Sequence, residues 1–353
     1  MTNQPKLGLL RLVAQHIAGE RLPSAAAVVR HMTAMQAQDY GGALTAIALR
    51  IDGGKRGDVE IALDNGEIVR SWPMRGTLHF VASQDLSWML GLTTARIIAG
   101  ATTRHSALGF DDAQFARARD IAVEVLHDSP RLTRDDFLAS FSARGFDVSG
   151  QRAYHTIWYL AQTGVICFGP VRGNQQQLVL VDDWIKTPRT LERDEALAEW
   201  VFRYFTSHGP ASVKDFVRWS GLRVSDVRLG LSLVQAQLAR ITVEGIDYFM
   251  DVETPDRLAK FRRVAKGVFL LPGFDEFVLG YGDRNAIVAP EFAARIVPGG
   301  NGMFKPTVVS DGRVVGTWKP VGSGPGRRVE AAPFVAFSAK VAEGISRAGA
   351  ALP

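Results

Sequence analysis

The feature that most constrains the fold is a pattern of helix, turn, helix and hairpin that recurs along the chain. The clearest copy is LTRDDFLASFSARGFDVSGQRAYHTIWYLAQTGVICFGPVRGNQQQLVLV. Thr133 is placed to cap a first helix and Ser149 a second one, whose apolar residues follow helical spacing. VICF and QLVLV then predict two strands joined by a tip that contains glycine and asparagine. This layout is typical of a winged helix-turn-helix.

A second copy follows directly in ASVKDFVRWSGLRVSDVRLGLSLVQAQLARITVEGIDYFM. Ser212 with Asp215 forms an acidic capping pattern, and Ser225 is expected to begin the next helix. ITV and DYFM predict a short hairpin across Glu244 and Gly245. Two units of one design are therefore expected in tandem.

The amino-terminal segment fits the same template. Ser24 is placed to cap AAAVVRHMTAM, Asp58 to open VEIAL, and IVRSW and TLHFVA predict strands around the turn PMRG. After about residue 255, β-rich runs flank the turn SDGR. We expect an α+β protein of tandem winged helix-turn-helix units followed by a β-containing C-terminal domain. The expected boundaries are 1–105 for the first unit, 106–188 for the second, 189–255 for the third and 256–353 for the C-terminal domain.

Composition fits a multidomain globular protein. A chain of 353 residues exceeds the size of one usual core, and 46% apolar with 22% charged residues supplies ample core material. The amino terminus lacks the pattern of a signal peptide, and Arg96 interrupts the apolar run MLGLTTARIIAGA. We expect a cytoplasmic protein without membrane contact. Cys167 is the only cysteine, so an intramolecular disulfide is excluded, and VICF predicts that it is buried.

The sequence lacks the motifs that several classes of reaction require. The seven histidines form no HExxH pair, the zinc-deaminase pattern is absent, and VGSGPGRR lacks the lysine and hydroxyl of a phosphate-binding loop. No nucleophile elbow of the G-x-S-x-G type occurs. We therefore expect neither a metal ion nor an organic cofactor. A net charge of +5 mildly favours a polyanionic partner, and winged helices often bind duplex nucleic acid, although they also serve as protein-contact modules.

The stretch MQAQDYGG, residues 35–42, displays two glutamines one residue apart. Side chains at i and i+2 diverge by about 200° around an α-helix but point the same way in extended backbone. Gln36 and Gln38 can therefore converge only if the preceding helix has ended, which the two following glycines favour. A second QAQ, at Gln235 and Gln237, lies in a stretch that we predict to be helical, and we assign it no role. For Gln36 and Gln38, a polar helix end is the simpler interpretation when the tripeptide is taken alone.

Paired amides suit a particular kind of hydrolysis. A glutamine amide takes up no proton at neutral pH, but its oxygen accepts a hydrogen bond from water and its NH₂ donates to a sugar or base. Two such groups can hold a water at an anomeric carbon without the charge of a carboxylate. They suit a leaving group that is already activated, such as a purine made cationic by N7 alkylation. Asp39 can add charge, cap the next segment or face solvent.

Taken together, MQAQDYGG, WPMRGTLHF, LLPGFDEFVLGYGDR and FKPTVVSDGRVVGTW resemble the winged-helix DNA glycosylase family that includes AlkZ, YcaQ and AlkX. The resemblance covers nearly the whole chain. The family signature is glutamine, an apolar residue, then glutamine or aspartate, which corresponds here to Gln36, Ala37 and Gln38. This is the double-glutamine form associated with AlkZ-like enzymes.

The resemblance implies a monofunctional, metal-independent glycosylase that cleaves the N-glycosidic bond of N7-alkylated purines in double-stranded DNA. It also implies unhooking of interstrand crosslinks and self-resistance to a DNA-alkylating natural product. Gln36 and Gln38 are expected to position the attacking water, with Gln38 as the direct contact. We expect a monomer. The rival hypotheses are a non-catalytic winged-helix transcription regulator and a protein-interaction scaffold.

DNA contacts are expected from basic residues near predicted turns and wings. Arg75 and His79 are candidates near the lesion, with a wing arginine and a structural histidine as the alternatives. Asp275 and Glu276 are interpreted as architecture and given no catalytic role. The expected DNA-binding residues are Arg75, His79, Arg152, Arg172, Lys305, Arg327 and Arg328, and Arg144, Arg223 and Arg228 are further candidates for phosphate contacts. An ordinary solvated charge is the simpler interpretation of any single basic residue outside the Arg75–His79 turn.

Overall fold

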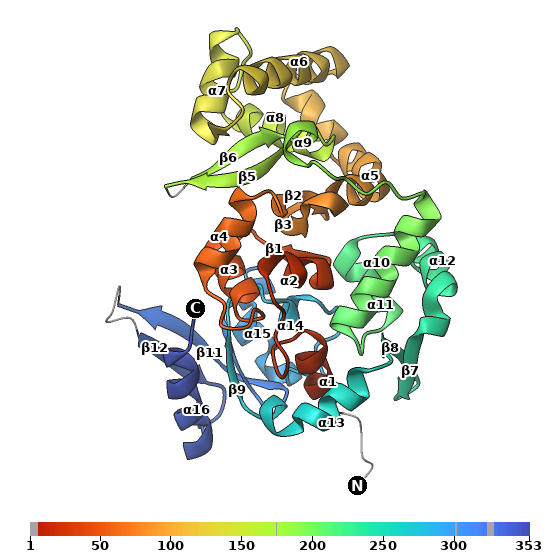
Figure 1. Ribbon diagram of the computed structural model, residues 1–353, viewed down its shortest axis with the longest axis vertical. Coiled ribbons are helices and arrows are strands. Elements are labelled where there is room, and N and C mark those ends of the chain that lie inside the picture. The colour runs from red at the N-terminus through yellow and green to blue at the C-terminus, as the bar shows by residue number, and fades with distance from the viewer. Residues whose placement is uncertain (1–5, 174, 301, 323–327) are drawn as a thin grey trace. The chain divides into compact units, whose positions relative to one another are not determined.

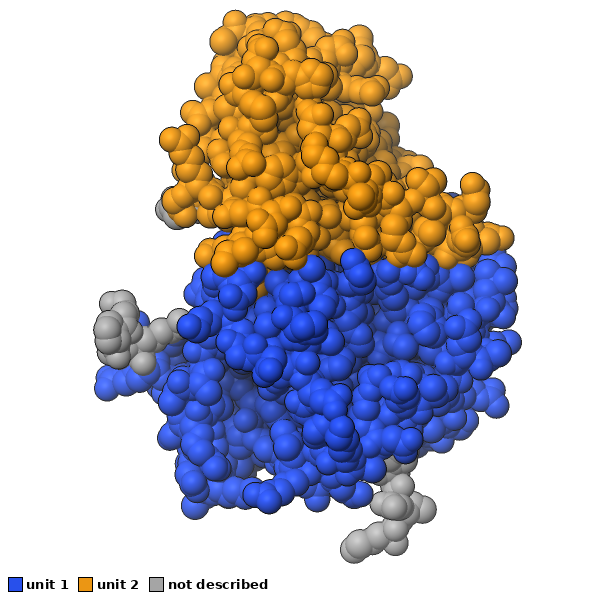
Figure 2. All heavy atoms as spheres, viewed as in Figure 1, with its two compact units in different colours: residues 1–58, 197–353 blue, residues 59–196 orange. Residues whose placement is uncertain are grey.

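The computed structural model describes residues 6–173, 175–300, 302–322 and 328–353. Contacts between Cα atoms divide the chain into two compact units, coloured in Figure 2. The first unit comprises Met1–Asp58 with Leu197–Pro353, and the second comprises Val59–Ala196. The four-part division expected from the sequence follows a different criterion, the repeat of elements along the chain, and stays a prediction.

One order of elements recurs along the chain: helix, short strand, helix, helix and two strands (Figure 1). The first copy comprises α2 (Ala25–Met32), β1 (Ala34–Gln36), α3 (Tyr40–Ala48), α4 (Arg56–Asp64), β2 (Ile68–Met74) and β3 (Thr77–Ala82). The second comprises α6 (Asp112–Asp128), β4 (Leu132–Thr133), α7 (Arg134–Ala143), α8 (Gln151–Gln162), β5 (Ile166–Arg172) and β6 (Gln175–Leu180).

The third copy has a single bridge between Ala211 and Phe249 in place of the short strand. Its other elements are α10 (Arg193–His208), α11 (Val213–Ser220), α12 (Val224–Val234), β7 (Leu238–Val243) and β8 (Ile246–Asp251). The predicted hairpins β2–β3, β5–β6 and β7–β8 are confirmed as antiparallel pairs. The tandem winged-helix arrangement itself stays a prediction.

The remaining elements connect these copies and build the C-terminal part of the chain. The helices are α1 (Leu7–Ala14), α5 (Leu86–Ala107), α9 (Val181–Trp184), α13 (Thr254–Ala265), α14 (Glu276–Leu279), α15 (Ala293–Ile296) and α16 (Ala339–Ala350). The 3-10 turns are η1 (Ser83–Asp85), η2 (Gln235–Gln237), η3 (Pro290–Phe292) and η4 (Pro298–Gly300). The strands are β9 (Val268–Leu271), β10 (Thr307–Ser310), β11 (Arg313–Val321) and β12 (Arg328–Pro333).

Each unit has a sheet with helices packed on it. In the second unit, antiparallel strands run in the order β3-β2-β5-β6-β4, and its core gathers aromatic side chains such as Phe137, Phe141 and Trp158. In the first unit, the sheet β12-β11-β10-β9 packs against α16 through Trp318 and Ile345. β10 and β11 form the hairpin predicted across SDGR. None of the helices within the described ranges is long and apolar enough to cross a membrane.

The residues predicted to be core are buried. Trp72, Trp158, Trp219 and Trp318 are each 6% exposed or less, which confirms that they are core residues. Cys167 is fully buried, and burial raises the pKa of its thiol well above the ordinary value. The thiol is therefore protonated and shielded, as expected for a small apolar core side chain.

The second helix of every copy begins at a side-chain cap. Asp39, Thr133 and Ser212 each accept a hydrogen bond from the backbone N–H three residues further on. Such caps satisfy donors that the helix itself leaves unpaired. The caps predicted at Thr133, Ser212 and Ser24 are confirmed.

Three predicted helix starts are wrong by one or two residues. α8 begins two residues after Ser149, because Gly150 turns the chain with a φ of 53°. α12 begins one residue before Ser225. α4 begins two residues before Asp58, whose carboxylate accepts the backbone N–H of Lys55 at 2.7 Å.

Asp215 does more than the sequence pattern predicts. Its Oδ2 accepts the N–H of Ser212 at 2.9 Å and the hydroxyl of Ser212 at 2.8 Å. Its Oδ1 accepts the N–H groups of Gly282 and Asp283 at 2.9 and 3.1 Å. The carboxylate is 1% exposed, so these donors depend on it.

Replacing Asp215 by alanine leaves these donors without their acceptor inside the protein. We expect the free energy of unfolding to fall by about 3 kcal/mol, since unsatisfied buried polar groups are costly. Ser212→Ala removes the two hydrogen bonds of the Ser212 hydroxyl but keeps those from Gly282 and Asp283, and it should cost about 1 kcal/mol. Urea denaturation followed by circular dichroism measures both losses. Equal losses in the two variants would show that the bonds from Gly282 and Asp283 add nothing to stability.

Candidate functional site

The stretch that carries the two glutamines leaves helical geometry before it reaches them. α2 ends at Met32, and Thr33 turns the chain with a φ of 68°. Strand β1 ends at Gln36, and α3 begins after Asp39. The predicted end of a helix ahead of Gln36 and Gln38 is confirmed, and at least Gln36 lies in extended backbone.

The expectation that the glycine pair stops the helix is wrong. Gly41 and Gly42 lie in the first turn of α3, and the chain breaks earlier, at Thr33. Gly42 has a different purpose, because a Cβ there would lie 2.6 Å from the Oδ2 atom of Asp39. Glycine therefore leaves room for the carboxylate that caps α3.

The two glutamines differ in exposure. Gln36 is half-buried, and its side-chain oxygen is enclosed and accepts no hydrogen bond from the residues that the structure describes. Ala37 is buried, and Gln38 is exposed. Gln38 is thus accessible from outside, while Gln36 offers an acceptor at the edge of the core.

The second QAQ has a different setting. α12 ends at Val234, so the prediction that Gln235 and Gln237 lie inside an α-helix is wrong. They form one tight 3-10 turn, which lets the chain leave the helix and enter β7 four residues after Val234. All three residues of this turn are exposed. The tripeptide therefore occurs twice in two unrelated backbone geometries.

A buried carboxylate lies behind the first glutamine. Oε1 of Glu276 accepts the backbone N–H of Gln36 at 3.1 Å, and its Oε2 accepts the indole N–H of Trp219 at 2.8 Å. Nε2 of His208 lies 3.4 Å from the same Oε2. Glu276 is 1% exposed. Sequence spacing does not predict this contact, because the two partners are 240 residues apart. The one local signal is that an acidic pair lies in an apolar run.

The neighbouring carboxylate belongs to a second buried pair. Asp275 accepts both terminal nitrogens of Arg50, at 2.9 and 3.0 Å, and neither side chain is more than 1% exposed. Arg50 also donates to the carbonyl of Ala46 and to the carbonyl and side-chain oxygens of Gln15. Asp275 is therefore architectural, as the sequence predicted, and it holds the loop that presents Glu276.

Comparison with known proteins identifies the family. The family model for DNA glycosylase AlkZ-like proteins matches residues 29–353. An interstrand DNA cross-link repair glycosylase of Streptomyces sahachiroi is 31% identical over 327 residues, which cover 88% of this chain and 86% of the relative. The chain belongs to the AlkZ-like DNA glycosylase family.

A solved structure agrees with this assignment. The Streptomyces sahachiroi DNA glycosylase AlkZ superposes with a TM-score of 0.81 at 26% identity, over 98% of this chain and 95% of that one. The family predicted from the sequence motifs is thereby confirmed, and so is a mixed α and β fold. The AlkZ-like chain is an enzyme of the DNA glycosylase class.

In the second unit of this AlkZ-like glycosylase, His79 is fully buried and supports Arg75. Because a carbonyl only accepts and a guanidinium only donates, Nδ1–H of His79 donates to the carbonyl of Thr77 at 2.7 Å and Nε2 accepts from Arg75 at 3.2 Å. Burial, with the nearby Arg75 cation, lowers the pKa of His79 to about 3. His79 is thus a neutral histidine that positions the half-buried Arg75 at the β2–β3 turn.

The other expected DNA-binding residues differ in their exposure and contacts. The side chain of Arg152 makes contacts within the second unit, where it pairs with Asp147 at 3.2 Å and stacks over Phe110. Arg172, at the end of β5, is exposed. Lys305 and Arg328, both in the first unit, are exposed too. Arg327 lies outside the described residues.

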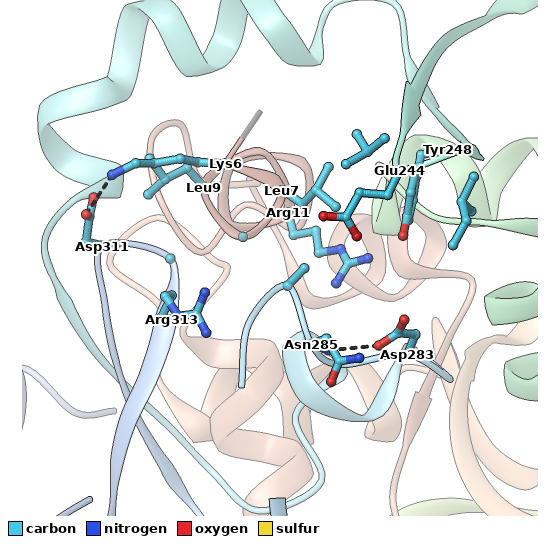
Figure 3. A pocket seen from close by; sticks show the side chains of 15 residues that line it. Lys6, Leu7, Leu9, Arg11, Glu244, Tyr248, Asp283, Asn285, Asp311 and Arg313 are labelled. Atoms are coloured by element: carbon cyan, nitrogen blue, oxygen red, sulfur yellow. Dashed lines mark hydrogen bonds and ion pairs between the residues drawn. The ribbon is translucent and has the colours of Figure 1, made fainter. Parts of the chain in front are cut away.

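An open pocket of about 370 Å³ lies elsewhere in the first unit of the AlkZ-like chain, between α1, β8 and two loops (Figure 3). Its lining carries charges of both signs, including Arg11 and the 2.9 Å ion pair of Lys6 with Asp311. Neither Gln36 nor Gln38 lines it. Among the described residues, no group of three or more His, Cys, Asp or Glu side chains can hold a metal ion.

The state of His79 predicts how stability depends on pH. The folded protein keeps this histidine neutral, while the unfolded chain takes up a proton near the ordinary pKa of 6.5. The unfolded state therefore binds more protons as the pH falls from about 6.5 towards about 3, and His79 lowers stability over that window. His79→Gln removes this contribution.

We expect the melting temperature of His79→Gln to fall less than that of the wild type between about pH 7 and about pH 5. Thermal melts at a series of pH values, followed by circular dichroism, make the comparison. Identical pH dependence in the two proteins would contradict a buried, neutral His79.

Proposed function

We propose that this glycosylase hydrolyses the N-glycosidic bond of N7-alkylated purines in duplex DNA, including purines joined in interstrand crosslinks. Membership of the AlkZ-like family and the name of the Streptomyces sahachiroi relative, a cross-link repair glycosylase, support the proposal. The observation that carries it is the setting of Gln36 and Gln38, two residues apart where a strand ends, with Gln38 exposed.

The chemistry matches neutral amides. Alkylation at N7 gives the purine a positive charge, so cleavage of the glycosidic bond releases a neutral base and leaves a cationic sugar. The oxygen of one glutamine accepts a hydrogen bond from the attacking water, and an NH₂ group can donate to the sugar. Water adds to the anomeric carbon and loses its proton to solvent. A strong base is unnecessary, because the leaving group is already activated.

An exposed Gln38 also suits a crosslinked substrate. A base tethered to the opposite strand cannot swing into a deep pocket as a free lesion does. A contact residue at the surface can reach such a base without complete extrusion. Protection of a cell that makes a DNA-alkylating natural product is part of the same proposal and is supported by the family resemblance.

The assay is alkali cleavage of a duplex that carries N7-methylguanine or a defined crosslink. Incubation with the protein followed by alkali should give strand breaks at the lesion. Absence of breaks above background on every N7-alkylpurine tested would favour a non-catalytic DNA-binding protein instead.

Gln38→Ala should lower the single-turnover rate by more than about tenfold, because it removes a group that positions the water. Affinity for undamaged duplex should stay within about threefold of the wild type. Gln237→Ala is the matched control, since it makes the same change in the same tripeptide at an exposed turn. An unchanged rate in Gln38→Ala, or an equal loss in Gln237→Ala, would remove Gln38 from the mechanism.

Among the basic residues, we propose that Arg172 contacts DNA phosphates and that Arg152 serves stability. Arg172→Ala should weaken duplex binding and reduce its salt dependence at an unchanged melting temperature. Arg152→Ala should lower the melting temperature, because Asp147 and Phe110 lose their partner. Fluorescence anisotropy at several salt concentrations, with thermal melts, separates the two roles. The reverse pattern would exchange the assignments.

A further inference from the structure

Glu276 is a buried carboxylate that bonds directly to the glutamine motif. Its oxygens accept the backbone N–H of Gln36 at 3.1 Å and the indole N–H of Trp219 at 2.8 Å. With an exposure of 1%, it has no route to the attacking water. Any effect on the reaction must therefore pass through Gln36.

The segment is fixed on both sides of the glutamines. Glu276 holds the N–H at the end of β1, and Asp39 holds the start of α3 through the N–H of Gly42 at 3.1 Å. Gln36, Ala37 and Gln38 lie between these anchors. Side-chain directions follow from backbone direction, so the peptide that carries the Gln36 N–H sets where both amides point.

We propose that Glu276 is a positioning residue for the reaction, holding the backbone of Gln36 so that the amides of Gln36 and Gln38 meet one water. This inference rests on the proposed glycosylase function. The carboxylate is itself fixed, because Asp275 caps α14 through the N–H of Phe277 at 2.9 Å and is bound by Arg50. Glu276 thus connects the motif to a rigid part of the protein interior.

The hydrogen bonds to Glu276 allow a specific test by mutation. Gln36 and Trp219 both donate to Glu276, and a carboxylate can accept both bonds. Glutamine at position 276 has one accepting oxygen and one donating NH₂, so one of the two N–H groups must face a donor. Removing the indole donor with Trp219→Phe frees the amide oxygen for the Gln36 N–H.

The experiment compares Glu276→Gln, Trp219→Phe and the double variant by steady-state cleavage of an N7-methylguanine duplex. We expect Glu276→Gln to lower kcat by about tenfold or more with KM within about threefold. The double variant should recover a large part of the lost kcat. Glu291→Gln, at an exposed glutamate, is the matched control and should behave as the wild type.

A readout without catalysis tests the contact itself. Hydrogen exchange at the Gln36 amide should be slow in the wild type, fast in Glu276→Gln and slow again in the double variant. Rapid exchange at Gln36 in the wild type would overturn the inference even if every variant failed to fold.

The outcomes separate this inference from the proposed function. A wild type that cleaves no lesion removes the proposed function, while the exchange rates still report on the Glu276 contact. An active wild type with Glu276→Gln at full kcat overturns the positioning role. So does a loss of kcat that the double variant does not recover while both variants melt well above the assay temperature.

Discussion

The buried ion pair between Arg50 and Asp275 is the constraint on which the candidate site depends. Every donor of the guanidinium has a partner, and both charges lie away from water. Loss of one partner would leave the other charged and buried, at a cost of about 3 to 5 kcal/mol. The pair joins the region just after α3 to the loop before α14. It thereby ties the amino-terminal part of the first unit to its C-terminal part.

Two buried carboxylates lie behind the glutamines of this candidate site. The carboxylates of Asp275 and Glu276 are enclosed and already accept hydrogen bonds from protein donors. Both are therefore closed off from solvent. Nearer the surface lie the amides of the half-buried Gln36 and the exposed Gln38, beside the exposed carboxylate of Asp39, which caps α3. Under the proposed function, these neutral amides suit a substrate whose leaving group is already activated.

Local signals in the sequence predicted local structure well. Helix caps at Thr133 and Ser212 and hairpins around short turns depend on neighbouring residues, so they can be recognised from spacing. The helix end before Gln36 was also predicted, although for the wrong reason. The chain turns at Thr33, whose φ of 68° is unusual for a β-branched residue. The spacing of apolar and polar residues does not predict such a turn.

Contacts between distant parts of the chain were beyond prediction. The bond from the Gln36 N–H to Glu276 spans 240 residues, and a single chain without aligned relatives holds no information on such pairing. The same holds for the first unit, which is built from two separate stretches of sequence. The family resemblance identified the motif, but the support behind it became visible only in three dimensions.

The three caps at equivalent places in the repeated order have a consequence for how this enzyme can change. Asp39, Thr133 and Ser212 each start the second helix of a copy, and only the first is preceded by glutamines. The architecture therefore needs a cap at this place but not an amide before it. The residues proposed for catalysis and the residue that caps the helix are thus different residues of the same short segment. A chain that lost Gln36 and Gln38 would keep the cap of α3, so under the proposed function this scaffold can lose or gain catalysis with few substitutions.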